Sequence, residues 1–319
     1  MALLSNQDSE KIGLTDLDPI SEAGRKVLRF HYLRMISHEA GTRQGEDIEE
    51  LHDMRVATRR LRSAIGTFRL FYQKKYHKRF MSDLRDVGIV LGRVRDFDVF
   101  LVNLSQGQQF HLLKDNINLS DLKRYWESER ETACLAMNLH LDGKRYRNLL
   151  KDFARFIETP FFGIKKNLLG EIHPPDVRSS MPGLISTHYL RAQAIGKGVD
   201  HAPVEKLHKL RIEIKKFRYC LEFFSEVLGS KSEQLIDQLK QIQDHLGKLN
   251  DANVAVEMMG ELIETSTQSI RTLDQDACNK YFQYKLTERD QLQQSFPDVW
   301  HRLVNSDFEV ELFFLLGRQ

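Results

Sequence analysis

The chain has 319 residues, of which 41% are apolar and 29% charged, and its formal net charge is only +2. This profile is typical of a soluble globular protein with room for two domains, and it argues against a disordered or globally basic chain. Three cysteines, without metal-binding or redox spacing, indicate a reducing compartment. No signal peptide and no apolar run of membrane-spanning length is recognisable, so we expect a cytoplasmic protein.

The first predicted helix follows a polar and acidic segment. Residues 1–20 are expected to form a mobile arm. A helix is predicted to begin near Ser21, a good N-cap residue, and to end at Gly41. It contains the sequence His-Tyr-Leu-Arg at 31–34, and the same four residues recur at 188–191. This repetition suggests that two halves of the chain begin with equivalent helices.

The next predicted helix, residues 51–68, carries two rows of side chains at helical spacing. An apolar row indicates a face packed in a core: Met54, Thr58, Leu61, Ile65 and Phe68. A second row is basic and would run about 15 Å along the flank of that core. Its members step by three, four and three residues: His52, Arg55, Arg59 and Arg62.

Residues 207–224 repeat this pattern 156 positions later. The apolar row recurs as Leu210, Ile214, Phe217, Leu221 and Phe224, and the basic row as His208, Arg211, Lys215 and Arg218. A constant offset of this size indicates a duplicated unit rather than a short solenoid repeat.

A further pair of helices is predicted at 81–104 and 236–259, at an offset of 155. Each has a line of three residues at steps of seven and four: Arg85, Gly92 and Asp96 in the first, and Lys240, Gly247 and Asp251 in the second. A helix-interior glycine costs about 1 kcal/mol relative to alanine, so we expect a close approach of another helix or of a ligand there. The aspartate is expected to orient a basic-row arginine through a charge-assisted hydrogen bond.

The remaining pattern is helical too, and no alternating strand is found. Further helices are predicted at 120–140, 143–158, 250–265, 274–295 and 297–316, with a proline-rich junction at 165–182. The predicted fold is therefore all-α, with two pseudo-symmetric bundles of about four long helices each from an internal duplication. The predicted boundaries are an arm over 1–20, a first bundle over 21–170 and a second over 180–319.

Two basic rows suit a row of anions. Arginine can bind phosphate oxygens with two parallel hydrogen bonds, and lysine acts as a point charge. Two rows that face each other across a cleft would grip a linear polyanion from both sides. Such binding should weaken steeply with salt.

The motif His-x-x-Arg-x-x-x-Arg/Lys-x-x-Arg, followed by Leu-Gly-x-Val/Leu-x-Asp, resembles the CHAD family, the conserved-histidine α-helical domain. Here it comprises His52 to Arg62 with Leu91 to Asp96, and again His208 to Arg218 with Leu246 to Asp251. The resemblance covers nearly the whole chain after the first twenty residues. It implies two helical bundles around a basic central cleft, and binding of inorganic polyphosphate. Members of the family often associate with bacterial polyphosphate granules.

The resulting hypothesis is non-enzymatic binding of polyphosphate, with no catalytic residue, metal site or cofactor. The predicted binding residues are His52, Arg55, Arg59, Arg62, Arg85, His208, Arg211, Lys215, Arg218, Lys240, Arg34 and Arg191. For the last two, a link to acids of a neighbouring helix is an alternative. Arg60 and Lys216 are expected to be surface charges, and Glu222 an ordinary i,i+4 partner of Arg218.

Three other functions stay open. The first is an enzyme of polyphosphate metabolism such as a phosphohydrolase, although no phosphate-binding loop or metal-binding motif is found. The second is nucleic-acid binding, which is not expected because aromatic residues do not alternate with the basic ones. The third is a module that binds an acidic protein. Whether a divalent cation accompanies polyphosphate, and which oligomer forms, also stays open.

Overall fold

The structure is a computed structural model that describes residues 11–110, 119–166, 174–264 and 273–317. In these four segments every regular element is a helix, and the β-pairing is limited to two isolated bridges. The all-α prediction is therefore confirmed. None of the described helices is both long and apolar enough to cross a membrane.

The helices of the first half are α1 (Ile20–Ser37), α2 (Glu39–Gln44), α3 (Ile48–Thr67), α4 (Lys74–Phe110), α5 (Ser120–Leu141) and α6 (Lys144–Glu158). Those of the second half are α7 (Val177–Gly196), the 3₁₀ turn η2 (Val199–His201), α8 (Val204–Phe223), α9 (Ser225–Leu228), α10 (Lys231–Glu264), α11 (Gln275–Leu303) and α12 (Ser306–Gly317). Among the described residues, five helices of the first half and four of the second have 15 residues or more, which agrees with the predicted number of about four. The internal duplication itself stays a sequence prediction.

Several predicted boundaries are wrong for local reasons. The first helix ends at Ser37, and the left-handed residue that closes the next one is Gly45 (φ 73°), not Gly41. Pro182 and Pro297 lie inside α7 and α11 instead of ending them. Pro182 is the sixth residue of α7, and because it has no N–H it cannot donate to the carbonyl of Arg178 one turn earlier.

Part of the predicted mobile arm is anchored. The backbone N–H groups of Ile12, Gly13 and Leu14 donate to the Glu226 carboxylate at 2.6–2.8 Å. The Leu14 side chain is buried. A carboxylate of the second half therefore fixes this segment, which no local pattern could show, whereas residues 1–10 lie outside the described residues.

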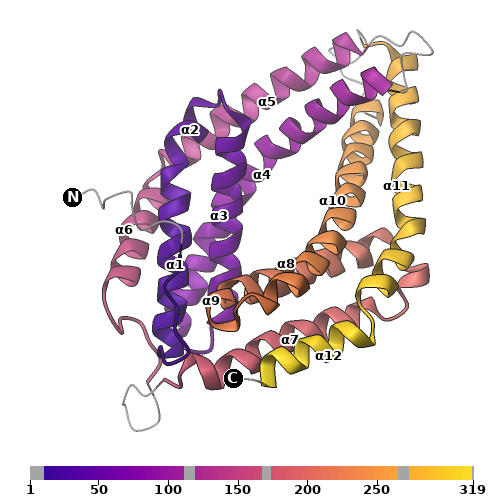
Figure 1. Cartoon of the computed structure of the whole chain (residues 1–319). Coiled ribbons are helices and arrows are strands. Elements are labelled where there is room, and N and C mark those ends of the chain that lie inside the picture. Colours follow the sequence, from indigo (N-terminus) through magenta and orange to yellow (C-terminus); the bar gives the residue numbers. More distant parts are fainter. Residues whose placement is uncertain (1–10, 111–118, 167–173, 265–272, 318–319) are drawn as a thin grey trace.

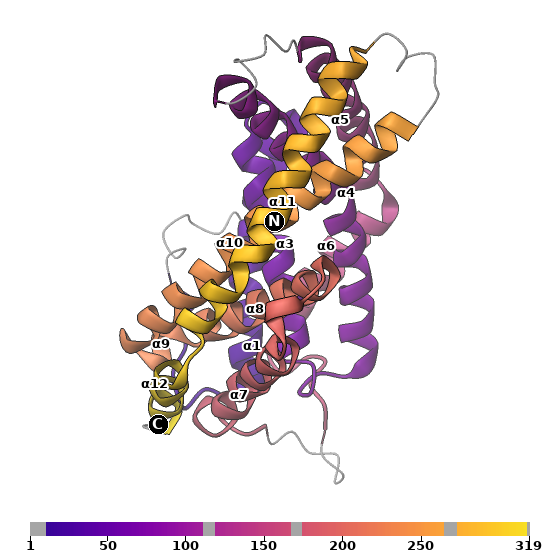
Figure 2. The ribbon, with the colours of Figure 1, turned by 90° about the vertical axis from the view of Figure 1, so that its right-hand side faces the viewer.

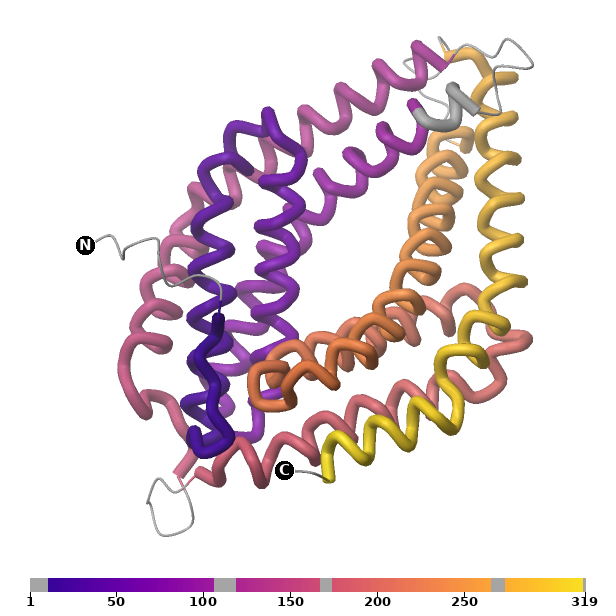
Figure 3. Tube along the Cα trace, in the orientation of Figure 1, coloured from indigo at the N-terminus to yellow at the C-terminus, as the bar shows by residue number. Residues whose placement is uncertain are grey.

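The helices lie around a central region of the molecule (Figure 1). In Figure 1, α1 and α3 lie on the left, α4 and α5 at the upper left, α10 and α11 on the right, and α7, α8 and α12 at the bottom. The quarter-turned view shows α10 and α11 running side by side along the molecule (Figure 2). The Cα trace shows that the C-terminal end of α8 lies beside the first-half helices (Figure 3). The α3–α8 contacts show that the two halves meet directly, and α10 and α11 pack against each other within the second half.

The cores explain this arrangement. Both predicted apolar rows, on α3 and α8, are buried, and they share one large cluster that combines the two halves. A smaller cluster also joins them, with Phe97 and Trp126 packed near Met259 and Tyr281. The aromatic side chains of Phe68, Tyr72, Phe217 and Phe223 are all buried as well. Burial of the apolar rows fixes the rotation of α3 and α8, so their basic rows must face sideways.

Candidate functional site

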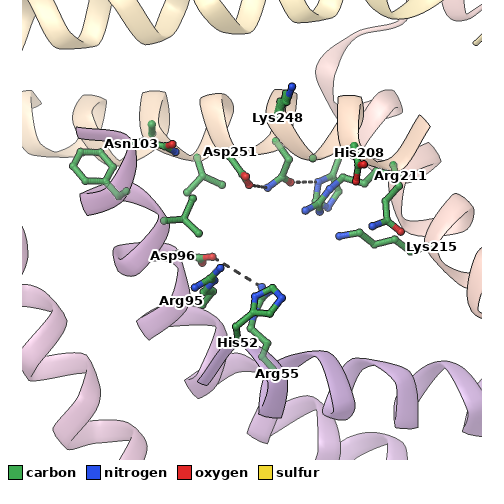
Figure 4. A pocket seen from close by; sticks show the side chains of 18 of the residues that line it. His52, Arg55, Arg95, Asp96, Asn103, His208, Arg211, Lys215, Lys248 and Asp251 are labelled. Carbon is green, nitrogen blue, oxygen red and sulfur yellow. Dashed lines mark hydrogen bonds and ion pairs between the residues drawn. The ribbon is translucent and has the colours of Figure 1, made fainter. Parts of the chain in front are cut away.

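A cavity of about 710 Å³ lies where α3 and α4 face α8 and α10. Six of the predicted residues line it, three from each basic row: His52, Arg55, Arg59, His208, Arg211 and Lys215. Figure 4 shows His52 and Arg55 on one side of the cavity, and His208, Arg211 and Lys215 on the other. The cavity therefore collects side chains that are 156 positions apart in the sequence.

The predicted glycine line borders this cavity. A Cβ atom on Gly92 would lie 3.7 Å from Nε and Nη2 of Arg55, so the arginine lies directly over the helix backbone at ordinary contact distance. Gly247 lines the cavity, and a Cβ there would meet nothing within 4 Å. The close neighbour that we expected is therefore found at Gly92, where it is an arginine side chain. It is not found at Gly247, which faces open space.

Positive charge dominates the lining. The cavity is lined by six lysine and arginine residues, namely Arg55, Arg59, Arg95, Arg211, Lys215 and Lys248. Three aspartates oppose them: Asp96, Asp244 and Asp251. The aspartates therefore neutralise only part of the lining.

The two equivalent aspartates hold their arginines loosely. Nη2 of Arg55 lies 4.0 Å from Oδ1 of Asp96, which makes an ion pair but not the hydrogen bond that the sequence predicted. Asp251 raises the pKa of Arg211, although burial is the larger effect and lowers it. Asp251 also accepts from Asn250 Nδ2 at 3.4 Å, and Asn250 Oδ1 lies 3.1 Å from His208 Nδ1. The arginines therefore keep donors available for a ligand.

The cations crowd one another in the cavity. Burial, followed by the charges of Arg211, Arg59 and Arg55, lowers the pKa of Lys215 to about 6. Burial is also the largest cause of the lowered pKa values of Arg55 and Arg211. On Asp96 burial raises the pKa, against the attraction of Arg55. An anion in the cavity would relieve this repulsion and stabilise every cation in the lining.

Six other predicted residues do not line the cavity: Arg62, Arg85, Arg218, Lys240, Arg34 and Arg191. Arg218 donates from Nε to Gln243 Oε1 at 2.9 Å and pairs with Glu222. Arg34 and Arg191 are exposed on α1 and α7, and Arg34 lies over the Phe30 ring. Arg62 and Arg218 are the last members of their rows, and the crossing of α3 and α8 encloses only the first three of the four residues of each row.

Arg60 is not the surface charge that we expected. Its Nη2 lies 2.8 Å from Glu222, and its guanidinium lies over the Tyr219 ring. Glu222 is therefore more than an i,i+4 partner of Arg218, because it also links α8 to α3. Tyr219 Oη accepts a 2.8 Å hydrogen bond from Arg59 Nε. By contrast, Lys216 is partly exposed and pairs with Glu213, three residues earlier on the same helix.

Sequence reasoning missed part of the lining. Arg95 and Lys248 contribute charge, and Asn103, Gln243 and Asn250 contribute amides. Arg95 and Lys248 lie inside the two Leu-Gly motifs, which was the available signal. Nothing in the sequence indicates Asn103, because it reaches the cavity only through the direction of the long helix α4.

Comparison with known proteins agrees with this geometry. The CHAD domain profile matches residues 26–260, which is most of the chain. The chain belongs to the CHAD family. No curated protein sequence matches this CHAD protein.

Two solved structures share its fold. The crystal structure of the CHAD domain from the plant Ricinus communis superposes with a TM-score of 0.74 at 22% identity, and it covers 92% of this chain and 95% of that one. PptA from Streptomyces chartreusis superposes with a TM-score of 0.66 at 14% identity, covering 89% of this chain and 99% of that one. At these identities the likeness concerns the fold.

Proposed function

We propose that this CHAD protein binds inorganic polyphosphate in the cavity between α3, α4, α8 and α10, without breaking it down. The observation that carries the proposal is that three of the four residues of each basic row line one cavity. CHAD membership supports it, because polyphosphate binding is what the resemblance implies. Attachment to polyphosphate granules would be the simplest consequence in a cell.

The cavity suits a linear chain of phosphates better than a single anion. One phosphate engages two or three cations, whereas this lining offers six that belong to four helices. A chain that passes between α3 and α8 can contact Arg55 and Arg59 on one side and Arg211 and Lys215 on the other. Partial burial strengthens each contact relative to water, and charge-assisted bonds from arginine are the strongest available.

The direct test removes one arginine from each row. We expect Arg55→Ala combined with Arg211→Ala to weaken binding of long-chain polyphosphate by roughly a hundredfold or more, since each hydrogen bond to a charged group contributes about 1.5–3 kcal/mol. Arg34→Ala combined with Arg191→Ala is the matched control, because both residues are exposed and neither lines the cavity. Circular dichroism should show unchanged helix content in both. Equal affinities for the two double variants would refute the site.

Two further measurements separate the alternatives. Single-stranded DNA of equal charge should compete at least tenfold more weakly than polyphosphate, because the cavity has no row of aromatic rings for bases. Equal competition would favour a general polyanion site. Release of phosphate from polyphosphate, measured with and without Mg²⁺, should stay at the level of the buffer. Sustained release would make the protein an enzyme.

A further inference from the structure

A second basic surface lies on the N-terminal half of α4, outside the cavity. Lys74, Lys78 and Arg85 are exposed and follow one another at steps of four and seven residues, so they share one face of the helix. Arg62 of α3 lies close to Arg85, since repulsion from Arg85 is the second cause, after burial, of the lowered pKa of Arg62. We call these four residues the α4 stripe.

The stripe is continuous with the cavity. Two glycines of α4 lie between Asp96 and Arg85. A Cβ on Gly92 would lie 3.7 Å from the Arg55 guanidinium, and a Cβ on Gly88 would lie 3.4 Å from Nη1 of Arg62. The two guanidinium groups thus lie over successive turns of α4, with Arg85 on the next turn. From Asp96 in the cavity to Lys74 this face of the helix extends about 33 Å.

The stripe keeps its charge. The nearby carboxylates of α4 are engaged elsewhere, because Asp83 pairs with Arg79 and Arg145, and Asp86 also pairs with Arg145. Among the described residues, no ion pair is found for Lys74, Lys78, Arg85 or Arg62. Nε of Arg62 is buried and has no hydrogen-bond partner in the described part of the chain. A buried donor without an acceptor is costly, so an arriving anion would find it ready to bind.

The corresponding surface of the second half has the opposite character. The positions 155 residues after Lys78 and Ser82 are Glu233 and Asp237, both exposed. The counterpart of Arg62 is Arg218, which is paired with Glu222 and Gln243. Lys240, the counterpart of Arg85, is exposed on a surface that also carries the two acids Glu233 and Asp237. A polyanion would be attracted on one side of the cavity and repelled on the other.

We propose that a long polyphosphate chain leaves the cavity in one direction only, over the α4 stripe, so that the stripe selects long chains over short ones. This inference rests on the proposed function, because the stripe extends the same binding site. Cations spaced along a rigid helix each add a contact to a repeating polyanion, whereas a ligand confined to the cavity gains nothing from them.

The test compares two chain lengths and two equivalent positions. Tripolyphosphate and long-chain polyphosphate are each titrated into four proteins. These are the wild type, the double variant with Lys74→Glu and Lys78→Glu, the single variant Arg85→Glu and the single variant Lys240→Glu. We expect the two α4-stripe variants to bind long chains about tenfold or more weakly and tripolyphosphate within twofold of the wild type. The salt dependence for long chains should become less steep, by about 0.7 per lost phosphate contact if the single-strand value holds. Lys240→Glu should change neither affinity by more than twofold.

The outcomes separate this inference from the proposed function. If the wild type binds neither ligand, the cavity proposal itself fails. If the wild type binds both, and the α4-stripe variants bind long chains as well as the wild type does, the one-sided exit is refuted while the cavity site stands. An equal loss for Lys240→Glu and Arg85→Glu would also refute it, because the chain would then leave on both sides. Unchanged helical circular dichroism shows that the exposed substitutions leave the fold intact.

Discussion

Lys215 should make polyphosphate binding depend on pH near neutrality. Burial and the charges of Arg211, Arg59 and Arg55 lower its pKa to about 6, from the ordinary 10.5. At pH 7 roughly a tenth of the free protein then carries an ammonium group at this position. A bound phosphate chain favours the charged form, so binding should take up about one proton per site.

The size of the effect follows from that pKa. Below pH 6 the amine is charged with and without ligand, and this group contributes no pH dependence. Above pH 6 the free protein loses the proton while the complex keeps it, so the affinity falls by about tenfold per pH unit until the pKa of the complex is reached. Between pH 6 and pH 8 the loss should be about 50-fold, which corresponds to about 2.3 kcal/mol.

Calorimetric titration with long-chain polyphosphate at pH 6, 7 and 8 measures this directly. Constant ionic strength is essential, and two buffers with different ionisation enthalpies reveal the proton uptake. Lys215→Arg is the matched control, since a guanidinium stays charged throughout this range. It should bind at pH 8 nearly as tightly as at pH 6. His52 also lines the cavity, and burial lowers the pKa of its imidazole, so pH dependence that Lys215→Arg retains is assigned to other groups of the lining such as His52. A wild-type change below threefold, or an equally steep Lys215→Arg, would show that Lys215 is charged in the free protein.

Two further predictions concern positioning and packing. Tyr219→Phe removes the hydroxyl that accepts a hydrogen bond from Arg59 Nε, so the Arg59 side chain is less ordered and polyphosphate affinity should fall about two- to fivefold. In an Arg59→Ala background the same substitution should leave the affinity unchanged. A loss of affinity that persists in that background would mean that the hydroxyl acts in another way. Gly196→Ala should lower the free energy of unfolding in urea by about 1–3 kcal/mol, because its Cβ would overlap Cζ2 of the buried Trp300. Gly183→Ala, in the same helix with open space around it, should instead be neutral or stabilising by up to about 1 kcal/mol, and equal losses at both positions would contradict the packing argument.

Much of the site could be predicted from the sequence because helical periodicity is a local property. Apolar residues at three- and four-residue steps showed which face of α3 and α8 is buried, and this fixed the direction of His52 and His208. The repetition at an offset of 156 then suggested that both rows serve one ligand. The structure brings Arg55 and Arg211 together in the lining of one cavity, whereas the shared ligand stays a proposal.

Periodicity does not tell where another helix crosses. Arg62 and Arg218 continue their rows in sequence, yet the crossing of α3 and α8 leaves both outside the cavity. Arg60 points away from its row by helical angle, yet a carboxylate of the other half, Glu222, binds it. Asn103 lines the cavity only because α4 extends as far as Phe110.

The sequence by itself thus determined the helices, their buried faces and the two basic rows, because each depends on residues within a few turns of one another. The tertiary structure alone decided which cations share a cavity, which are neutralised by acids far along the chain, and how strongly the pKa of Lys215 is lowered. Those properties depend on distances between residues that are far apart in the sequence, and such distances are set by packing of the whole chain.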